Sequence, residues 1–575
     1  MSIRKHTVLF FLILTLLVTS LSSGIVAEAQ TVTPFADVPQ GHWAYGQILR
    51  LRELSITQGI GNNKFGFGMT LKRGEFVTFL VRLMGWEIVK PAKGSFSDNM
   101  DPSHNFYGSI ETALLHGVIK KDSDRFRTED PITREEIAIM IVRTLGYDTL
   151  ANQLNALDKP FNDITQNTGY ITIAKDLGII FGDGKNFNPK DTATREQAAA
   201  MLIRMYDKLN TPLAELHAFY AISSSSQISK FSSLDSVSFG WARLEYDETT
   251  KQVKINTDNG TNEYYIPTGY AGVIEKAKNS QISRQLMFFV NEQNVFDVTS
   301  NKTVKLAEYI VSNKEVSKQV IDAMVAMVNN TSKYGSSISF DGLVSDFEGF
   351  KGEALKQSYN AFLTELNTQL DKTNKTLYVA VHPKRKPGQA YFDGYDYKTI
   401  GELADKVILM AHDYDATALT DDEMNSRYND TPVTPFDEVY YALKSITDPV
   451  SGVKDLNKIW LQLSMDSVQW KLKDGKVINR IPYHPSYEQI YTRFLSGATL
   501  KYSELSQNPY AKFDAEDGTQ NIIWYENQRS IAEKIKLAKM FGIKGLSLWR
   551  LGNIPDYADT PELSLDIWGE IMKNY

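Results

Sequence analysis

An internal repeat in the first third of the chain constrains its fold more than any other feature. Three phenylalanines recur with a constant period of 61 residues: Phe65, Phe126 and Phe187. Eight residues after each of them stands an arginine: Arg73, Arg134 and Arg195. Units of about 50–60 residues bury little apolar surface alone. The three copies are therefore expected to pack together, as repeats generally do.

Each unit opens with Phe-x-Asp and is predicted to contain two helices joined by a loop. The first helix is clearest after Trp43, where Ile48, Leu51 and Leu54 fall at helical spacing. The second helix follows each arginine, at residues 76–83, 137–145 and 198–205. The repeats predict an all-α three-repeat bundle with units at residues 35–86, 96–147 and 161–207.

The segments around the three arginines resemble the Thr-Arg-Ala-Glu motif of S-layer homology domains: Leu71–Glu75, Ile132–Glu136 and Ala193–Gln197. The resemblance implies a pseudo-threefold bundle that holds surface proteins on anionic secondary cell-wall polysaccharide. Arg73, Arg134 and Arg195 would then bind the polymer, since a guanidinium beside a helix N-terminus suits a carboxylate. The alternative is that these arginines only pair with neighbouring acids.

The first 29 residues have the three-part pattern of a secretory signal peptide. Arg4 and Lys5 precede an apolar run over residues 8–18, and Ala27 and Ala29 form a cleavage-like site. The alternative is an uncleaved anchor, but the run is shorter than the ~20 apolar residues that a membrane span needs. With the repeats, this segment predicts a secreted protein at the cell wall of a Gram-positive-type bacterium, with no transmembrane segment in the mature chain.

Composition excludes several classes of protein. The 575 residues include no cysteine, which rules out disulfides, thiolate metal sites and cysteine nucleophiles. The net charge of −7 argues against a nucleic-acid partner, which normally meets a basic patch. No metal-binding motif and no phosphate-binding glycine loop is present, so we expect neither a metal nor a cofactor.

From residue 213 to 575, short apolar runs alternate with longer amphipathic stretches. We predict eight strands: residues 218–222, 237–241, 286–290, 338–344, 377–381, 407–411, 459–463 and 545–549. Helices are predicted between them, for example at residues 317–328, 352–370 and 528–540. Such alternation indicates a parallel sheet. Eight units over this length fit an α/β TIM barrel with insertions, and a doubly wound open sheet is the alternative.

Two carboxylates stand at the end of the fourth predicted strand. Side chains alternate along a strand, so Val344, Asp346 and Glu348 share one face. If Val344 points inward, both acids face the barrel axis at its catalytic mouth. Two close carboxylates can split their pKa values, so that one keeps a proton. A solvated loop is the alternative.

This segment resembles the Asp-Gly-x-Asp-x-Asp-x-Glu motif of family 18 glycoside hydrolases. Asp341, Gly342, Asp346 and Glu348 match it, and Val344 departs from it at the middle aspartate. The resemblance implies substrate-assisted, retaining hydrolysis. Glu348 would be the general acid and base, Asp346 would orient the substrate acetamido group, and Asp341 and Gly342 would be structural.

Two further segments support the same resemblance. The sixth strand leads into Met410, His412, Asp413 and Tyr414, which is similar to the family's Met-x-Tyr-Asp with histidine in place of tyrosine. The eighth ends at Trp549, like the family's terminal tryptophan strand. By resemblance, Met410, Asp413, Tyr414 and Trp549 bind substrate. The imidazole at position 412 predicts a sensitivity to pH near ~6–7.

A third segment, residues 524–530 together with Lys534, is similar to the bacterial wall-lytic branch of that family. The predicted function is a wall-anchored hydrolase of β-1,4-linked N-acetylglucosamine glycan, with peptidoglycan and chitin both open. The alternatives are a lectin-like, non-catalytic sugar-binding protein on the same barrel and a purely structural S-layer subunit. Linkage specificity, endo or exo cleavage and oligomeric state are not predicted.

Overall fold

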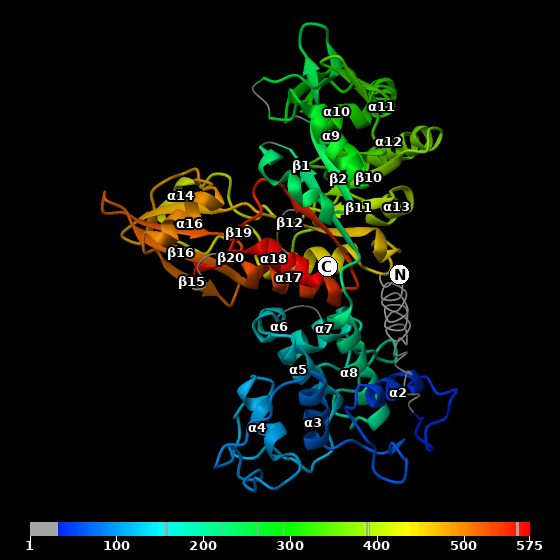
Figure 1. Ribbon diagram of the computed structural model, residues 1–575, viewed down its shortest axis with the longest axis vertical. Coiled ribbons are helices and arrows are strands. Elements are labelled where there is room, and N and C mark those ends of the chain that lie inside the picture. The colour runs from blue at the N-terminus through cyan, green and yellow to red at the C-terminus, as the bar shows by residue number, and fades with distance from the viewer. Residues whose placement is uncertain are drawn as a thin grey trace, which may run out of the picture. The chain divides into compact units, whose positions relative to one another are not determined.

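The computed structural model describes residues 33–155, 159–221, 223–260, 263–290, 292–386, 389, 391–558 and 563–575 (Figure 1). The predicted signal peptide lies outside these residues. Contacts divide the chain into two compact units. The first comprises Met1–Leu115, Lys121–Ile132 and Thr192–Ile203, and the second comprises His116–Lys120, Thr133–Asp191 and Arg204–Tyr575. No helix in the described part of the chain has the length and apolar character to span a bilayer.

The N-terminal repeats are all-α, as predicted. Their helices are α2 (Tyr45–Glu53), α3 (Arg73–Leu83), α4 (Tyr107–Leu115), α5 (Arg134–Thr144), α6 (Asp148–Leu154), α7 (Thr168–Asp176) and α8 (Arg195–Asn210). Each repeat arginine is the first residue of its helix. At α5, Thr133 and Glu136 form a reciprocal capping box, which satisfies backbone N–H groups that the first helical turn leaves free.

The Phe-x-Asp motif has the same structural role in every repeat. Its aspartate accepts a hydrogen bond from the backbone N–H of the loop phenylalanine: Asp37 from Phe65 at 2.7 Å, Asp98 from Phe126 at 2.8 Å and Asp163 from Phe187 at 2.9 Å. The two phenylalanine rings of each repeat are in contact, with centroids 5.6–5.7 Å apart. The sequence repeat is thus a repeat of one loop held by one carboxylate.

Three backbone hydrogen bonds join the repeats in a closed ring. The N–H of Leu71 donates to the carbonyl of Ala193 at 3.0 Å, that of Ile132 to Leu71 at 2.9 Å, and that of Ala193 to Ile132 at 2.9 Å. Each of these residues lies two positions before a repeat arginine. Because every repeat supplies one donor and one acceptor, the three copies close the ring without leaving an end unpaired.

Eight parallel strands form a closed barrel in the order β1-β18-β12-β11-β10-β9-β4-β2, and β2 pairs back with β1. They are β1 (Glu215–Tyr220), β2 (Ser236–Asp247), β4 (Ser283–Val290), β9 (Gly342–Asp346), β10 (Thr376–Val381), β11 (Lys406–Leu409), β12 (Ile459–Ser464) and β18 (Gly545–Trp549). This confirms the predicted barrel and excludes the open doubly wound sheet. An additional strand, β3 (Gln252–Asn256), pairs antiparallel with β2.

The fourth predicted strand was placed too early. Residues 336–338 form β8 (Ser336–Ile338), which pairs with β7 (Thr331–Lys333) in a separate hairpin. The barrel strand β9 starts only at Gly342. The apolar run in the sequence spans both strands, so hydrophobicity alone does not separate them.

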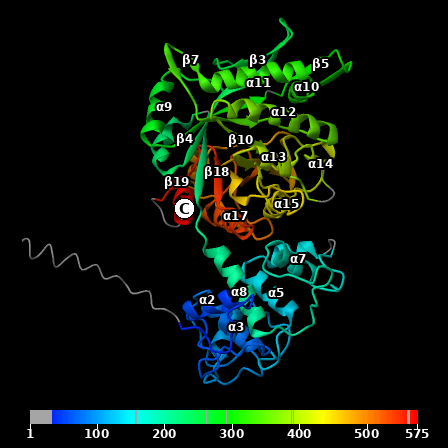
Figure 2. The same ribbon diagram turned by 90° about the vertical axis from the view of Figure 1, so that its right-hand side faces the viewer.

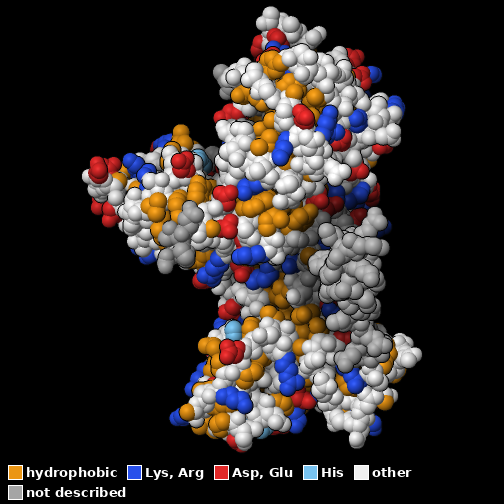
Figure 3. Space-filling view, viewed as in Figure 1, with side chains coloured by type: hydrophobic (Ala, Val, Ile, Leu, Met, Phe, Trp, Pro, Cys, Tyr) orange, Lys and Arg blue, Asp and Glu red, His pale blue; other side chains and the backbone are white. Residues whose placement is uncertain are grey.

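Helices surround the strands, as Figure 2 shows. The longer ones are α9 (Tyr270–Asn279), α11 (Lys314–Asn329), α12 (Glu353–Asp371), α15 (Phe436–Ile446), α17 (Gln528–Met540) and α18 (Ile567–Asn574). Shorter ones are α10 (Leu306–Ser312), α13 (Tyr397–Leu403), α14 (Asp421–Asn425) and α16 (Tyr487–Leu495). α12 is typical: Tyr359, Phe362, Leu363 and Leu366 are buried at helical spacing. On the face in Figure 3, cationic and anionic side chains are interspersed over the barrel.

A five-stranded antiparallel sheet is inserted between β12 and α17 and projects from the side of the barrel (Figure 1). Its strands are β13 (Val468–Lys473), β14 (Lys476–Val477), β15 (Thr499–Ser503), β16 (Asn508–Asp514) and β17 (Gln520–Trp524). Trp470 and Trp524 are buried in its core. The sequence predicted insertions but not this sheet, because its strands are short and polar residues alternate with apolar ones along them.

Gly342, at the start of β9, has no room for a side chain. A Cβ atom there would lie 2.0 Å from the Thr376 hydroxyl and 2.3 Å from the Thr376 carbonyl oxygen of β10. We predict that Gly342→Ala destabilises the chain by about 1–3 kcal/mol, the usual cost of overpacking. Differential scanning calorimetry should record the change as a lower unfolding temperature.

Gly272, on the exposed side of α9, provides the matched control, since a Cβ atom there meets nothing within 4 Å. Gly272→Ala should leave stability unchanged or raise it by up to about 1 kcal/mol. Equal unfolding temperatures for the two variants would contradict the steric account of Gly342.

Candidate functional site

A cavity of about 310 Å³ opens at the carboxyl ends of the barrel strands. Its wall is built by residues from six strands and the loops that follow them: Phe219, Tyr264, Asp346, Glu348, Ala380, His382, Pro383, Arg385, Phe392, Met410, His412, Asp413, Gln462 and Trp549. Phe219 and Trp549 make an aromatic floor with ring centroids 5.2 Å apart. The cavity thus combines apolar ring surfaces with titratable groups, the usual composition of a small-ligand site.

Asp346, the last residue of β9, and Glu348, two residues beyond it, enter this cavity from the same side, because Val344 points into the barrel core. Asp346 is only 6% exposed, and its Oδ1 atom has no hydrogen-bond partner in the described part of the chain. Burial, together with the nearby Glu348 carboxylate, raises the pKa of Asp346 well above its usual range. The Glu348 side chain is 37% exposed, with Oε2 3.5 Å from His382 Nε2. One acid is therefore buried and the other accessible.

Asp341 and Gly342 lie at the opposite end of β9 from the cavity. Asp341 accepts hydrogen bonds from Arg284, at 2.9 Å from its backbone N–H, 3.0 Å from Nε and 2.7 Å from Nη2. Arg284 belongs to β4, the neighbouring strand. This pair and the close approach of Gly342 to Thr376 hold β9 between its two neighbours, which sets the height at which the acids emerge.

The structure brings Met410, Asp413 and Trp549 into the cavity wall but not Tyr414. Asp413 has a positive φ of 59°, which interrupts the alternation of side chains after β11. The Tyr414 ring turns away and lies under the Arg385 guanidinium, 4.5 Å from its Cζ. A left-handed residue at this position could not be anticipated from an alternating pattern.

His412 also lines the cavity, where one ring nitrogen has a hydrogen bond and the other lies at ion-pair distance from a carboxylate. Nε2 lies 2.6 Å from Gln462 Oε1, and Nδ1 lies 2.9 Å from Asp413 Oδ2. Burial opposes the imidazolium charge, but the ion pair with Asp413 and the hydrogen bond to Gln462 outweigh it and raise the pKa to about 9. The expectation of titration near pH 6–7 is therefore corrected.

Four polar lining residues were not predicted: Tyr264, His382, Arg385 and Gln462. His382 directly follows β10, and Gln462 is a polar residue inside the apolar strand β12. Both positions carry a weak signal, since polar groups at strand ends of a barrel point to the site. Tyr264 and Arg385 lie on loops, where sequence offers no such signal.

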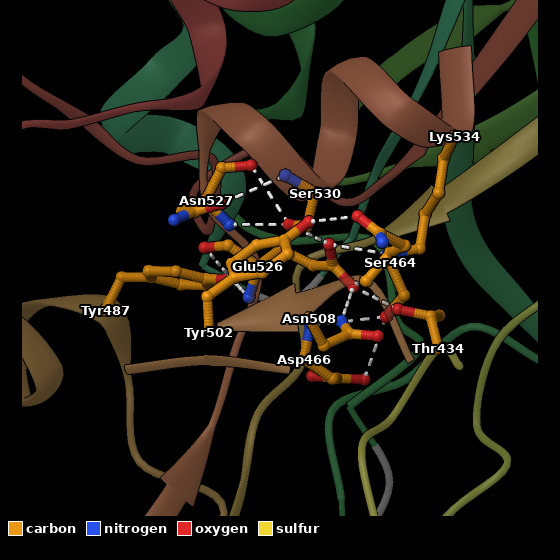
Figure 4. Close-up of polar contacts among 11 residues, drawn as sticks. Thr434, Ser464, Asp466, Tyr487, Tyr502, Asn508, Glu526, Asn527, Ser530 and Lys534 are labelled. Atoms are coloured by element: carbon orange, nitrogen blue, oxygen red, sulfur yellow. Dashed lines mark hydrogen bonds and ion pairs between the residues drawn. The ribbon is translucent and has the colours of Figure 1, made fainter. Parts of the chain in front are cut away.

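A buried ion pair lies behind β12 (Figure 4). Glu526, 1% exposed, follows β17 of the inserted sheet, and Lys534, 2% exposed, belongs to α17. Lys534 Nζ lies 2.9 Å from both carboxylate oxygens of Glu526. The same carboxylate also accepts hydrogen bonds from Ser530 at 2.5 Å, from Asn508 at 2.8 Å and from Thr434. This cluster fastens the inserted sheet to the barrel beside the cavity.

The repeat arginines form hydrogen bonds to the loops of the repeats. Each donates its Nε–H to a loop phenylalanine carbonyl at 2.9 Å: Arg73 to Phe126, Arg134 to Phe187 and Arg195 to Phe65. Arg195 is 3% exposed and pairs with Glu75 at 2.5 Å, as the alternative of paired acids predicted.

Arg134 has a different environment from Arg195. Its Nη2 donates to the Phe181 carbonyl at 2.8 Å, and no carboxylate pairs with it in the described residues. Burial lowers the pKa of this guanidinium. Phe181 itself is 57% exposed, and the Arg204 guanidinium lies 4.7 Å from its ring centroid. One cation thus lies over the exposed Phe181 ring, and a second is bound to the backbone carbonyl of the same residue.

Two family models match the chain. Residues 300–553 match "Glycosyl hydrolases family 18", and residues 34–77, 98–138 and 160–199 match "S-layer homology domain". The chain is 30% identical to S-layer protein sap of Bacillus anthracis over 38% of its own length and 26% of that protein. It is 25% identical to a cortical fragment-lytic enzyme of Bacillus anthracis over 48% of its own length and 60% of that enzyme. For the enzyme of the same name in Bacillus subtilis (strain 168), the identity is 22% over 43% of this chain and 53% of that one. The chain thus spans a quarter to three fifths of these relatives.

The Glu526–Lys534 pair yields a stability prediction. Lys534→Met leaves the Glu526 carboxylate buried without its cation, which typically costs about 3–5 kcal/mol. We expect a large fall in the denaturant midpoint, partly restored in the double variant Lys534→Met/Glu526→Gln. The control is Lys573→Met, which removes an exposed pair with Glu570 and should cost under about 1 kcal/mol. Equal effects of Lys534→Met and Lys573→Met would refute the role of the buried pair.

Proposed function

We propose that this chain, which carries S-layer homology repeats and a family 18 glycosyl hydrolase domain, is a cell-wall-anchored glycoside hydrolase of N-acetylglucosamine-containing glycan. The observation that carries the proposal is the pair of acids at the end of β9, one buried and one accessible, in a single cavity floored by Trp549. Its volume of about 310 Å³ falls at the lower end of the usual range for ligand pockets.

In the proposed mechanism, Glu348 gives its proton to the glycosidic oxygen as the bond from C1 to that oxygen breaks. The acetamido oxygen of the same sugar forms a bond to C1, which yields an oxazolinium and expels the leaving sugar. Asp346 accepts a hydrogen bond from the acetamido N–H, and its negative charge stabilises the positive charge of the oxazolinium. The Glu348 carboxylate then takes a proton from water, whose oxygen bonds to C1 while the bond between C1 and the acetamido oxygen breaks. The acetamide is restored, and the product keeps the original anomeric configuration.

Three other residues would bind the sugar in the cavity. Trp549 and Met410 offer apolar surface to the face of the ring, and Asp413 presents an ionised carboxylate to its hydroxyl or amide hydrogens. The pKa of Asp413 is lowered because the His412 cation outweighs burial. Tyr414 would act indirectly, by supporting Arg385.

Peptidoglycan is the substrate that we favour over chitin. Lys384, Arg385 and Lys386 are consecutive cations after β10, and Arg385 lines the cavity. Lys386 is paired with Asp437 at 2.9 Å, whereas the Nε of Arg385 is 3.9 Å from its acidic neighbour Glu438. A guanidinium with a distant counterion suits the carboxylates of peptidoglycan, which chitin lacks.

We further propose that the repeats bind anionic secondary cell-wall polysaccharide and hold the secreted chain at the cell surface. The Arg134 surface, composed of Arg134, Phe181 and Arg204, offers two cations and an aromatic ring to an acidic sugar. Arg195 is less suited to a ligand, because its charge is already paired with Glu75. Arg73 contributes through the loop that it holds at Phe126.

Glu348→Gln tests the hydrolase. The variant keeps the shape of the side chain but cannot donate the proton, so product release should fall by about 10²–10⁴-fold. Reducing ends released from peptidoglycan and from N-acetylglucosamine oligomers measure it. Glu353→Gln, an exposed change on α12, serves as the control and should keep the parent rate. Binding of these glycans by the parent without any product would instead favour the lectin-like alternative.

The Arg134 surface predicts how anchoring depends on charge. The double variant Arg134→Gln/Arg204→Gln should pellet with purified cell-wall sacculi at least about tenfold less than the parent, since charge-assisted contacts are lost. Lys121→Gln/Arg125→Gln removes the same charge from exposed positions of the second repeat and should pellet like the parent. Calorimetry should verify that all variants are folded. Equal pelleting of a folded Arg134→Gln/Arg204→Gln variant would reject this surface as the anchor.

A further inference from the structure

His412 and Val344 are two departures from the family pattern that lie inside the same barrel. Val344 belongs to the buried core cluster beneath the cavity, and His412 is buried in its wall. Where the pattern has an acid and a phenol, this chain has an apolar group and an imidazole. The first change removes a negative charge from the neighbourhood of Asp346, and the second adds a group that can be positive.

The partners of His412 determine its charge. Gln462 donates its Nε2–H to the Ser547 hydroxyl at 3.3 Å, so its Oε1 atom faces His412 and can only accept. The Asp413 carboxylate, 2.9 Å from Nδ1, also only accepts when ionised. Nε2 therefore carries the proton of the hydrogen bond to Gln462. The Asp413 carboxylate, in ion-pair contact with Nδ1 without hydrogen-bond geometry, favours a second proton on the ring, which makes it an imidazolium.

His217 provides an internal comparison. It is fully buried in the same barrel, and its ring nitrogens contact only the hydroxyls of Ser547 and Ser238, at 2.9 and 2.7 Å. Burial lowers its pKa to about 3, so it stays neutral. The carboxylate of Asp413 accounts for the opposite charge of His412.

Three carboxyl groups from neighbouring strands act on His412: Asp346 at the end of β9, Asp413 after β11 and Asp466 after β12. Among them, Asp346 is the one whose buried carboxylate lacks a partner on Oδ1 in the described chain. Burial and Glu348 both favour its protonated form, and His412 acts in the opposite direction.

We propose that His412 is a positioning residue of this site: its imidazolium favours the ionised form of Asp346, against burial and the neighbouring Glu348 carboxylate, and so directs the proton shared by the two acids toward Glu348. The inference rests on the proposed hydrolase function, in which Glu348 is the proton donor. The absence of an acid at position 344 serves the same end, because a second carboxylate there would push the proton onto Asp346. The paired Asp413 balances the imidazolium when the substrate becomes cationic.

The test compares pH profiles of the parent and His412→Gln, with peptidoglycan as substrate. Loss of the cation should raise both apparent pKa values of the acid pair, so the acidic limb of kcat moves to higher pH. We expect kcat to fall about tenfold or more and KM to change less than about threefold, since the proton is misplaced while binding surfaces remain. His412→Tyr should shift the limb in the same direction. A merely structural role would lower kcat without moving the limb.

A second measurement does not depend on catalysis. With ¹³C-labelled histidine, the resonance missing from His412→Gln identifies His412 in the folded parent chain, and its titration should have a midpoint near pH 9. A midpoint below 7, or an unchanged acidic limb in a folded, active His412→Gln variant, overturns the proposal and leaves the hydrolase assignment standing. A parent chain that cleaves neither peptidoglycan nor chitin oligomers overturns the hydrolase assignment and the proposal together.

Discussion

Closure of the eight-stranded barrel is the constraint on which the rest of the structure depends. Strand β1 pairs with both β18 and β2, so Ala218 lies beside Leu548 and Val237. Because all eight strands are parallel, their carboxyl ends meet at one mouth. Groups as distant in the chain as Phe219 and Trp549 then line a single cavity, and none of them has to be near another in sequence.

Buried charge is the second theme of the barrel. Lys534 is compensated by Glu526 and His412 by Asp413, whereas the buried His217 contacts the hydroxyls of two serines and remains neutral. Such pairs are tolerated in a low-dielectric interior only when partners meet at hydrogen-bond distance. The first pair fixes the inserted sheet. The second brings a cation to the acids of β9, which connects the packing of the barrel with the placement of one proton.

The three repeat arginines make the same contact through Nε, but the partners of their other guanidinium nitrogens differ from repeat to repeat. In every repeat the arginine donates its Nε–H to a loop carbonyl, so this nitrogen holds the loop and is not available to a ligand. The other nitrogens differ: Arg195 meets Glu75, whereas Arg134 meets a carbonyl beside the exposed Phe181. The same motif therefore does not create the same binding surface in every repeat. The Arg134 guanidinium suits an anionic ligand better than that of Arg195, whose charge is paired with Glu75.

The sequence by itself determined the features that rest on local patterns. The 61-residue period predicted the three-repeat helical bundle, and the alternation of short apolar runs with amphipathic stretches predicted the barrel. The alternation of side chains along a strand put Asp346 and Glu348 on one face. Tertiary structure decided everything that depends on distant neighbours. Gln462 of β12 meets the Nε2 of His412 from 50 residues away, the left-handed turn at Asp413 sends Tyr414 away, and Glu75 neutralises Arg195 across 120 residues of chain. Charge and protonation respond to what folding brings within a few ångströms, and a linear pattern does not record it.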